Sequence, residues 1–420
     1  MLSAGWILVG MISGFAVLSA CRVPLPLNLI LVAIAGALLG SFGLPFRHLV
    51  EGGFGYLNLI LALFAGAFFG QAMQLIGAPS RLAALVGASS SKWVALIVSG
   101  ALLFVTGMVT GIAGLAVLAV GAFAAPMLRG AGLSGVAAAA YIALMATLGM
   151  IAPPINVPAM IMADGVNMPY AGFSWSLLAL SVPTALFALV SFAGGARQTD
   201  AVAAPVDDGQ AKSSGALIGT IVLFAIILFW IALRIWPDSI FDPSTPLVLA
   251  VGGLIGLLLL KRARWKEVFQ PIFTGTPLIL AAVLVAVGVV VQIMALTGVR
   301  GWLVIQAMSF HPPTLYAAIA SIPILGSVLT SMGTANSLGV PFAFAFIHQD
   351  MILNISALSA IAALSEFCPP TAISAALAAY VVGENRVTPI IRAAIPTLIV
   401  LTILALSMLI LNPTVAPFLR

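Results

Sequence analysis

Charged side chains are scarce in this sequence of 420 residues, and their scarcity excludes most classes of soluble protein. Only 6% of the residues are Asp, Glu, Lys or Arg, whereas 62% are hydrophobic. A water-soluble globular domain carries about 25% charged residues. The chain is therefore predicted to be a polytopic membrane protein. Its net charge of +5 does not indicate nucleic-acid binding, because the basic residues stand singly between apolar runs or in one short cluster over 261–266.

Cysteine and histidine are also scarce, which excludes a disulfide framework and the usual zinc sites. The two cysteines, Cys21 and Cys368, lie in or beside apolar runs, and the three histidines have no second ligand three or four residues away. The sequence shows no His-Glu-X-X-His motif and no pattern of a serine nucleophile with its histidine. We therefore expect that the chain is not an enzyme and that it needs no cofactor other than a coupling ion.

Apolar runs of the length of a membrane span follow one another along the whole chain. A helix needs about 20 apolar residues to cross the hydrocarbon core. The first run has no basic region before it and no small-residue cleavage site after it, so it is predicted to be a retained span and not a signal peptide. Fourteen segments are predicted, at approximately 5–21, 25–43, 54–77, 93–109, 112–127, 134–163, 175–196, 215–236, 245–260, 271–297, 312–330, 334–348, 354–382 and 389–411.

Two pairs of these segments are joined too tightly for a loop outside the bilayer. Only Thr110 and Gly111 separate the two halves of residues 93–127, and only residues 331–333 separate the two halves of residues 312–348. Each pair is predicted to be a re-entrant helical hairpin whose tip stops inside the membrane. Such a tip is tolerated where it is buried in protein or faces a watery cavity.

Two longer segments, 134–163 and 354–382, are each interrupted by a tandem proline that begins at Pro153 or Pro369. A tandem proline removes two backbone donors and pushes the residue before it out of helical geometry. Each segment is therefore predicted to be a broken helix. The break leaves free carbonyl groups on one side and a new helix N-terminus on the other.

The order of tight hairpin, broken helix and span occurs twice at a nearly constant shift, which indicates an internal duplication. The first repeat is predicted over 1–196 and the second over 215–420, with a polar linker over 197–214. Placing the basic cluster over 261–266 in the cytoplasm puts twelve of the 16 Lys and Arg residues on that side. The N-terminus is then periplasmic, and the hairpins enter from opposite faces. The duplication is therefore predicted to be an inverted repeat.

Two hairpin tips and two broken helices that are related by inversion indicate the binding site of a secondary transporter near the middle of the membrane. The N-terminus of a half-helix carries about half a positive charge and free N–H groups that can hold a carboxylate. Unwound carbonyl groups and hydroxyls can coordinate sodium. The candidate substrate- and ion-binding residues are Thr106, Gly107, Thr110, Gly111, Gly149, Pro153, Asn156, Thr330, Ser331, Thr334, Asn336, Ser365, Glu366, Pro369 and Thr371. The sodium candidates among them are Thr110, Gly149, Thr330, Thr334, Asn336 and Ser365.

Glu366 is the one acidic residue deep within an apolar segment. An intramembrane carboxylate can serve as a sodium ligand, as a proton carrier or as the counter-charge of a bound cation. Alternatively, it only satisfies the unwound backbone beside it. The hydroxyl and glycine residues of the tips have an alternative role as well, because small residues let helices pack closely in membranes. Five polar residues within 330–337 favour a site at the second tip.

The sequence around the first break resembles a known family of transporters. Residues 149–154 read Gly-Met-Ile-Ala-Pro-Pro, and residues 125–129 before them read Ala-Pro-Met-Leu-Arg. This order is similar to the large membrane subunit of tripartite ATP-independent periplasmic (TRAP) transporters, the DctM-like proteins. In that family a Gly-X-X-X-Pro-Pro break follows a Pro-Glu-Met-Lys-Lys-type loop, and a Thr-Pro-Pro break lies near the C-terminus. The resemblance runs along nearly the whole chain.

The resemblance implies an elevator-type fold of the ion-transporter superfamily, with a scaffold domain and a mobile domain that holds both hairpins and both broken helices. It implies sodium-coupled transport of an organic acid such as a dicarboxylate across the bacterial inner membrane. The implied partners are a small four-helix membrane subunit and a periplasmic substrate-binding protein.

The chain departs from the family pattern at both proposed halves of the site. The first tip lacks the serine-rich run of the family, Cys368 stands where the family has threonine, and Glu366 replaces an apolar residue. A self-sufficient ion-coupled symporter of the same superfamily, working without partner subunits, therefore stays an alternative. A channel is disfavoured, because it would not need two opposed half-membrane hairpins.

Overall fold

The computed structural model describes residues 3–87, 91–195, 212–235 and 243–419, and all regular elements in these ranges are helical. Many large apolar side chains on the helices are exposed, including Leu228 and Ile403, as lipid-facing residues are. The prediction of an all-helical, multi-pass membrane protein is confirmed. Seven of the described helices are long and apolar enough to cross a membrane: Leu57–Leu75, Lys92–Thr110, Ala113–Gly130, Ser174–Gly194, Ser214–Leu233, Arg262–Leu296 and Val387–Ile410.

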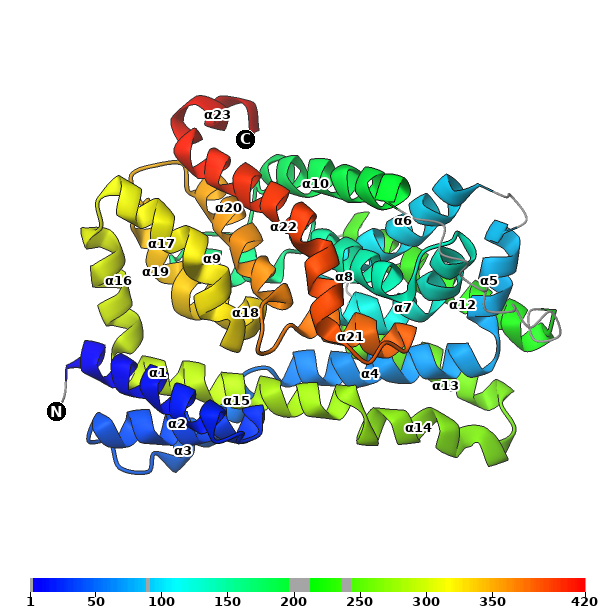
Figure 1. The fold of residues 1–420 in the computed structure, drawn as a ribbon, viewed down its shortest axis with the longest axis horizontal. Helices are drawn as coiled ribbons and strands as arrows, with labels where there is room; N and C mark the ends of the chain where they lie inside the picture. Colours follow the sequence, from blue (N-terminus) through cyan, green and yellow to red (C-terminus); the bar gives the residue numbers. More distant parts are fainter. Residues whose placement is uncertain (1–2, 88–90, 196–211, 236–242, 420) are drawn as a thin grey trace.

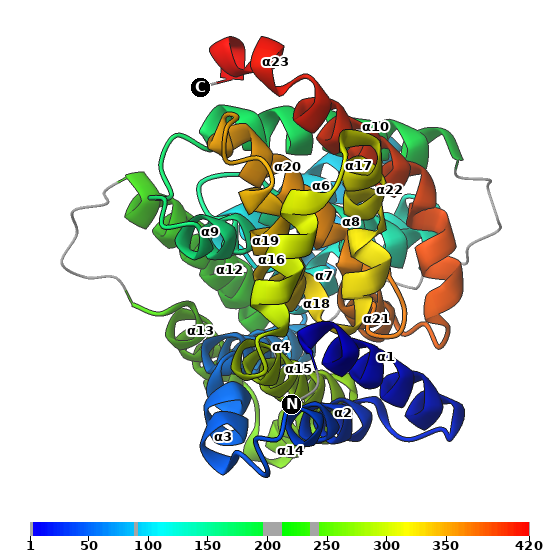
Figure 2. The ribbon, with the colours of Figure 1, turned by 90° about the vertical axis from the view of Figure 1, so that its left-hand side faces the viewer.

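The helices form two layers, which both views separate (Figures 1 and 2). We call the lower layer the arm layer. It is built around the two long helices α4 and α15, which run along it. In this layer α15 packs against α2 and α3, and α4 packs against α13. The arm layer comprises α1 (Ala4–Ala20), α2 (Leu25–Leu39), α3 (Phe46–Phe54), α4 (Leu57–Leu75), α13 (Thr245–Leu259), α14 (Trp265–Thr274) and α15 (Thr276–Leu296).

The second layer, called the hairpin layer below, holds both hairpins and both broken helices. Its centre is α8, in which every residue from Ala138 to Ile151 is buried. Small residues at these positions let α6, α7 and α21 pack closely around α8. The hairpin layer comprises α6 (Lys92–Thr110), α7 (Ala113–Gly130), α8 (Gly135–Ile151), α9 (Val157–Gly165), α10 (Ser174–Gly195), α17 (Pro312–Leu325), α18 (Thr330–Thr334), α19 (Val340–Phe344), α20 (Met351–Ala363), α21 (Ile373–Val382) and α22 (Val387–Ile410).

The first tip and both helix breaks lie where the sequence predicts them. Helix α6 ends at Thr110, and Gly111 turns the chain with a φ of +67° that favours glycine. The first tandem proline separates α8 from α9. The second follows a short 3-10 turn, Leu364–Phe367, that continues α20, and it is followed in turn by α21. The missing backbone donors of the prolines explain why the helices stop there.

The prediction of the second tip is wrong in its position. Residues 331–333 are helical, and the chain turns earlier, over Gly326–Leu329, before Thr330 with a φ of +62°. The hydroxyl of Thr334 donates a hydrogen bond to the carbonyl oxygen of Gly326 at 2.7 Å and holds this turn closed. The returning arm continues through a π-helical turn, Ala335–Gly339, into α19. The polar residues of 330–337 therefore belong to the returning helix and not to the loop.

Several short helices occupy stretches that lie between the predicted spans. They are too short or too polar on one face to be recognised as spans; in α3, for example, Arg47 and Glu51 form an exposed ion pair at 2.7 Å. The predicted segment 271–297 is also divided, because α14 ends before Gly275 and α15 begins after it. The additional helices outside the two layers are α5 (Ala78–Gly87), α12 (Ser214–Ile235), α16 (Val299–Ser309) and α23 (Asn412–Leu419).

The order of elements occurs twice among the described residues. An amphipathic helix, a long arm helix, a short helix, a hairpin, a broken helix and a span follow one another from α3 to α10, and again from α14 to α22. An internal duplication would produce this order, and the inversion of the two halves stays a prediction. The predicted linker over 197–214 lies mostly outside the described residues.

The close packing of the first hairpin on α8 leads to a testable prediction about stability. A Cβ added at Gly149 would overlap the backbone carbonyl of Phe104 on α6. Because that carbonyl cannot move alone, Gly149→Ala should lower the free energy of unfolding by roughly 1–3 kcal/mol. Thermal unfolding in detergent measures the loss. The matched control is Gly130→Ala, because a Cβ there meets nothing within 4 Å. Equal melting temperatures of the two variants would contradict this packing.

Candidate functional site

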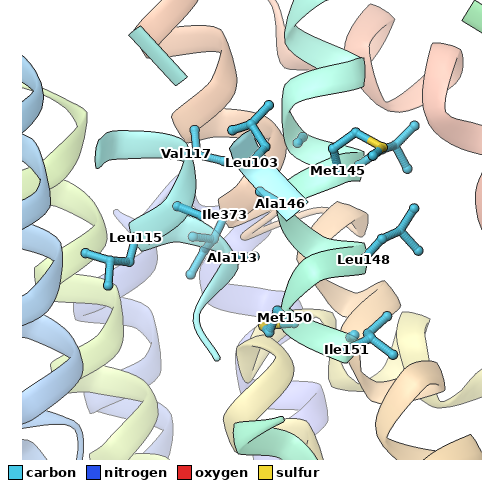
Figure 3. Close-up of a cluster of buried hydrophobic side chains, with 14 of the residues drawn as sticks. Leu103, Ala113, Leu115, Val117, Met145, Ala146, Leu148, Met150, Ile151 and Ile373 are labelled. Carbon is cyan, nitrogen blue, oxygen red and sulfur yellow. The ribbon is translucent and has the colours of Figure 1, made fainter. Parts of the chain in front are cut away.

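A small buried cavity lies where the two layers meet, and it brings together parts of the chain that are distant in sequence. Its volume is about 30 Å³, and it lies between the start of α7, the start of α18, the second helix break and the arm helices α4 and α15. A cavity of this size holds a water molecule or a small ion. Figure 3 shows four of the apolar residues of its wall, Ala113, Leu115, Met150 and Ile373.

Among the described residues, Glu366 contributes the one charged side chain of the cavity wall and is itself buried. The hydroxyl of Ser331 donates to Oε1 of Glu366 at 2.5 Å, and the backbone N–H of Ser331 approaches the same oxygen at 3.3 Å. The hydroxyl of Ser374 donates to Oε2 at 3.0 Å. Ser331 begins the returning arm of the second hairpin, and Ser374 lies in the first turn of α21. The carboxyl group therefore joins the start of the returning arm of the second hairpin to both sides of the second break.

The charge of Glu366 has no basic partner in the cavity wall, which is otherwise mostly apolar. A buried carboxylate is costly unless it is hydrogen-bonded and its charge is balanced. Three donors supply part of the stabilisation. A cation in the cavity would supply the remainder, because it would lie beside the carboxylate and away from water.

The N-terminus of α7 forms another wall of the cavity through Ile112, Ala113 and Gly114. The first backbone N–H groups of a helix have no partner inside the helix, and the helix dipole makes this end positive. The wall therefore offers donors that suit a carboxylate group, and they belong to the first hairpin, whereas Glu366 belongs to the second broken helix. The cavity thus joins an anion-binding feature of the first hairpin to an acidic side chain of the second half.

The candidate residues of the first tip do not line the cavity. The hydroxyls of Thr106 and Thr110 donate to carbonyl oxygens of their own helix, each at 2.7 Å. A Cβ added at Gly107 would meet the carbonyl oxygen of Ala146 at 2.5 Å, so this glycine serves close packing on α8. Gly111 packs against the first break, at Ile155. The tip residues that face the cavity instead follow Gly111 directly.

Asn156 closes the first break. Its Oδ1 accepts from the backbone N–H of Ala159 at 2.9 Å and caps α9, and its Nδ2 donates to the carbonyl oxygen of Ile151 at 3.0 Å. The same Nδ2 donates to the hydroxyl of Ser359 on α20 at 3.1 Å. The amide thus satisfies the unwound backbone and ties the first broken helix to the second. It does not line the cavity.

Of the sequence-predicted candidates, only Thr330, Ser331 and Glu366 line the cavity. Thr371 donates to the carbonyl oxygen of Ser327 and fastens the second break to the turn of the second hairpin. Ser365 donates to its own helix at Ala362. The predicted residues that do not line the cavity are Thr106, Gly107, Thr110, Gly111, Gly149, Pro153, Asn156, Thr334, Asn336, Ser365, Pro369 and Thr371.

The sequence reasoning missed Ser374 and the wall that the arm layer provides. Ser374 lies eight residues after Glu366, in the first turn of a half-helix, and this position could have indicated it. Leu59 and Leu63 of α4 line the cavity from the arm layer. They are ordinary apolar residues of a span, so no local signal marks them.

Comparisons with known proteins leave the family open. A scan against family models finds no match to this chain, and a search among curated proteins finds no match either. A functional assignment therefore rests on the architecture of the site and on the sequence resemblance.

Proposed function

We propose that this chain is the large permease subunit of a TRAP-type system that carries a small organic acid across the bacterial inner membrane, coupled to sodium. The observation that carries the proposal is the cavity that both the N-terminus of α7 and Glu366 line. Its walls come from one arm of each hairpin, from the second break and from the arm layer. A site of this kind, built from discontinuous helices, is typical of secondary transporters.

The positive N-terminus of α7 and the negative carboxylate of Glu366 together supply a reason why the acid and a cation would be transported together. A substrate carboxylate held at the N-terminus of α7 lies near Glu366, and two unit charges about 4 Å apart repel by about 4 kcal/mol at an effective dielectric constant of about 20. A cation between the two carboxylates removes this repulsion. The acid and the cation therefore bind better together than either binds alone, which is the condition for symport.

The energetics of such a cycle are adequate. Each sodium ion that moves inward across 100 mV supplies about 2.3 kcal/mol before its concentration gradient is counted. Two sodium ions could then carry a monoanion with net positive charge or a dianion with none. The membrane potential would drive the first case directly, whereas the sodium gradient alone would drive the second.

The two-layer architecture supports an elevator-type movement, with the arm layer as the scaffold and the hairpin layer as the mobile part. The cavity lies on the boundary between the layers, so relative movement changes which side of the membrane it faces. A volume of about 30 Å³ is too small for an organic acid, and the layers must separate there before one can bind. Backbone packing within each layer suits movement of the layers as rigid units.

The proposed partners are a small four-helix membrane subunit and a periplasmic substrate-binding protein. A self-sufficient symporter of the same superfamily is the alternative, and the departures at Glu366 and Cys368 favour keeping it. Uptake of labelled organic acids into proteoliposomes, with this chain alone and with both partners added, separates the two. Uptake only in the assembled system supports the TRAP proposal, uptake by the chain alone supports the symporter, and no uptake in either would contradict both.

Asn336 does not line the central cavity, and it tests the separate prediction of a sodium ligand on the returning arm of the second hairpin. Its side chain is half-buried in the π-helical turn and makes no hydrogen bond within the described part of the chain. Asn336→Ala should raise the sodium concentration for half-maximal uptake by ~10-fold, the value of one lost ligand to a charged group. Thr334→Ala should raise it too, and should also lower the abundance of the protein, because Thr334 holds the turn at Gly326.

The control for both variants is Ser321→Ala, because this hydroxyl bonds only to its own helix, at Ala318. It should change neither sodium affinity nor abundance. If Asn336→Ala lowers abundance and leaves the sodium dependence unchanged, Asn336 serves helix packing and is not a sodium ligand.

A further inference from the structure

A second cavity lies on the same boundary between the layers, farther along α4. Its volume is about 310 Å³, about ten times that of the central cavity and within the range of ligand pockets, about 300–1,000 Å³. It lies between α4 of the arm layer and α7 and α21 of the hairpin layer. We propose that it is a binding site for the transported organic acid at the cytoplasmic end of the pathway, where Gln71, Gln74 and Tyr380 hold the carboxylate before release. The inference rests on the proposed function.

The two cavities are lined by different residues of the same three helices, α4, α7 and α21, so they follow one another along the boundary between the layers. On α4, Leu59 and Leu63 face the central cavity, and Ala67 and Gln71 face the second. These residues are four apart, so they follow one face of the helix. From Leu63 to Gln71 the path advances about 12 Å at a rise of about 1.5 Å per residue.

The second cavity lies toward the cytoplasm in the predicted topology. Gln71 and Gln74 are in the last turn and a half of α4, just before the stretch that contains Arg81. Gly383 ends α21, just before the stretch that contains Arg386. Both arginines belong to the basic residues that place these ends of the helices in the cytoplasm.

The seam between the cavities is closed by direct contact of backbones. A Cβ added at Gly70 would overlap the carbonyl oxygen of Leu118 on α7, and a Cβ at Gly66 would meet a methyl group of Leu115 at 2.7 Å. Nothing the size of an organic acid passes there in this arrangement. The seam must open when the layers move, and a substrate leaving the central cavity then reaches the second one.

The polar groups of the second cavity suit a carboxylate. The amide Nε2 of Gln71 donates to the hydroxyl of Tyr380 at 3.1 Å, which leaves the hydrogen of that hydroxyl without an acceptor in the described part of the chain. Gln74 is exposed and forms no hydrogen bond there. The wall contains these donors and no acidic side chain.

Positive charge lies behind the same wall. The guanidinium of Arg129 donates to the carbonyl oxygen of Val382, which lines the cavity, at 2.7 Å, while its Nε is buried without a partner. The carboxylate of Glu384 lies near the same guanidinium, because both approach Gly135, and it offsets part of the positive charge that an anion in the cavity would meet. The Gln71–Tyr380 bond also joins the arm layer to the hairpin layer. A carboxylate that accepts a hydrogen bond from the Tyr380 hydroxyl therefore binds where the two layers are linked.

The experiment uses cysteine labelling in inverted membrane vesicles, which expose the cytoplasmic face. Both native cysteines, Cys21 and Cys368, are replaced by serine, and Ala122→Cys, which lines the cavity but has no role in holding the acid, is labelled with a membrane-impermeant maleimide. Pyruvate, succinate and malate are the probes, together with a parallel uptake assay. An acid that is taken up should slow labelling by ~10-fold at about ten times its half-protecting concentration.

A second pair of variants tests the role of the hydroxyl. Tyr380→Phe should raise the half-protecting concentration by ~10-fold, because it removes one hydrogen bond to a charged group. Tyr316→Phe is the control, because the Tyr316 hydroxyl has no hydrogen-bond partner among the described residues and lies in α17, away from the cavity.

The outcomes are distinguishable. Uptake of an acid that does not slow labelling of Ala122→Cys would overturn this inference and leave the proposed function intact. Protection that Tyr380→Phe and Tyr316→Phe both leave unchanged would remove the hydroxyl from the site and overturn the assignment to Tyr380. Labelling in right-side-out vesicles only would overturn the cytoplasmic placement. If none of the three acids is taken up or protects, the proposed function fails for these substrates and the inference fails with it.

Discussion

Replacing Glu366 by glutamine should abolish ion-driven uptake and leave the amount of protein in the membrane nearly unchanged. Glutamine keeps the shape of the side chain and an oxygen that accepts from Ser331 or Ser374, so the second tip stays joined to the break. It removes the negative charge that a coupling cation would balance. Removing one partner of a buried charge pair costs about 3–5 kcal/mol, which corresponds to a loss of affinity for the cation of ~100-fold or more.

The measurement is initial uptake at fixed sodium and pH gradients, normalised to the protein in the membrane. Asp164→Asn is the matched control: it makes the same chemical change at an exposed carboxylate at the end of α9. It should transport normally. A sodium-coupling role predicts that Glu366→Gln loses the sodium dependence, whereas a proton-carrying role predicts that it loses the pH dependence. If Glu366→Gln keeps normal uptake, and if uptake still depends on sodium and on pH as in the unmodified protein, Glu366 only stabilises the unwound backbone.

A disulfide bond between the two layers should stop transport completely and reversibly. An added Cβ at Gly66 on α4 lies 3.5 Å from the Cβ of Leu118 on α7, within the range of about 3.5–4.5 Å that a disulfide needs. The double variant Gly66→Cys with Leu118→Cys, in a chain with both native cysteines replaced, should form the bond on oxidation. If transport requires α4 and α7 to move past one another, uptake is then lost, and dithiothreitol restores it.

Two controls separate movement from damage. Each single variant should keep its uptake through oxidation and reduction. A second pair, Ile76→Cys with Gly215→Cys, joins the end of α4 to α12, with an added Cβ at Gly215 lying 3.6 Å from the Cβ of Ile76. This bond does not cross from α4 to the hairpin layer and should leave uptake unchanged. If the oxidised double variant Gly66→Cys with Leu118→Cys keeps full uptake, a sliding movement of α4 past α7 at this seam is excluded.

The sequence predicted the elements whose causes are local. A tandem proline ends a helix through its own missing donors, so the breaks at Pro153 and Pro369 could be placed to the residue. Gly111 marks the first tip for a similar reason, because its positive φ favours glycine. The second tip has no such marker. Its turn depends on a bond between Thr334 and Gly326, eight residues apart, and a run of hydroxyl residues indicated the wrong position.

Three of the candidate residues predicted from the sequence, Thr330, Ser331 and Glu366, line the central cavity, and the others do not. Glu366 was identified because a single acid in an apolar segment is conspicuous, and Ser331 because it belongs to a polar cluster. Which polar side chains face the cavity depends on the packing of distant helices, and this could not be read locally. The hydroxyls of Thr106 and Thr110 bond to their own helix, whereas the backbone of the next residues forms the wall.

Most of the functional proposal depends on the boundary between the layers. No local pattern in the sequence marks the residues that form this boundary. Leu59, Leu63 and Gln71 lie on one face of a helix that reads as an ordinary span. Tyr380 lies about 300 residues from Gln71, and only the fold brings them together. The order of breaks and hairpins predicts a duplication, but it does not predict the contacts between the two halves of the chain.

The central claim is that this chain couples the inward movement of an organic acid to an ion gradient, and accumulation in proteoliposomes tests it most directly. The purified chain, with and without its proposed partners, is given labelled acids under an inward sodium gradient, and the internal acid is measured over time. The account predicts that one acid rises above its external concentration and returns to equilibrium when a sodium ionophore dissipates the gradient. Uptake that stops at equilibrium under every sodium or pH gradient would contradict coupled transport and indicate a passive pathway.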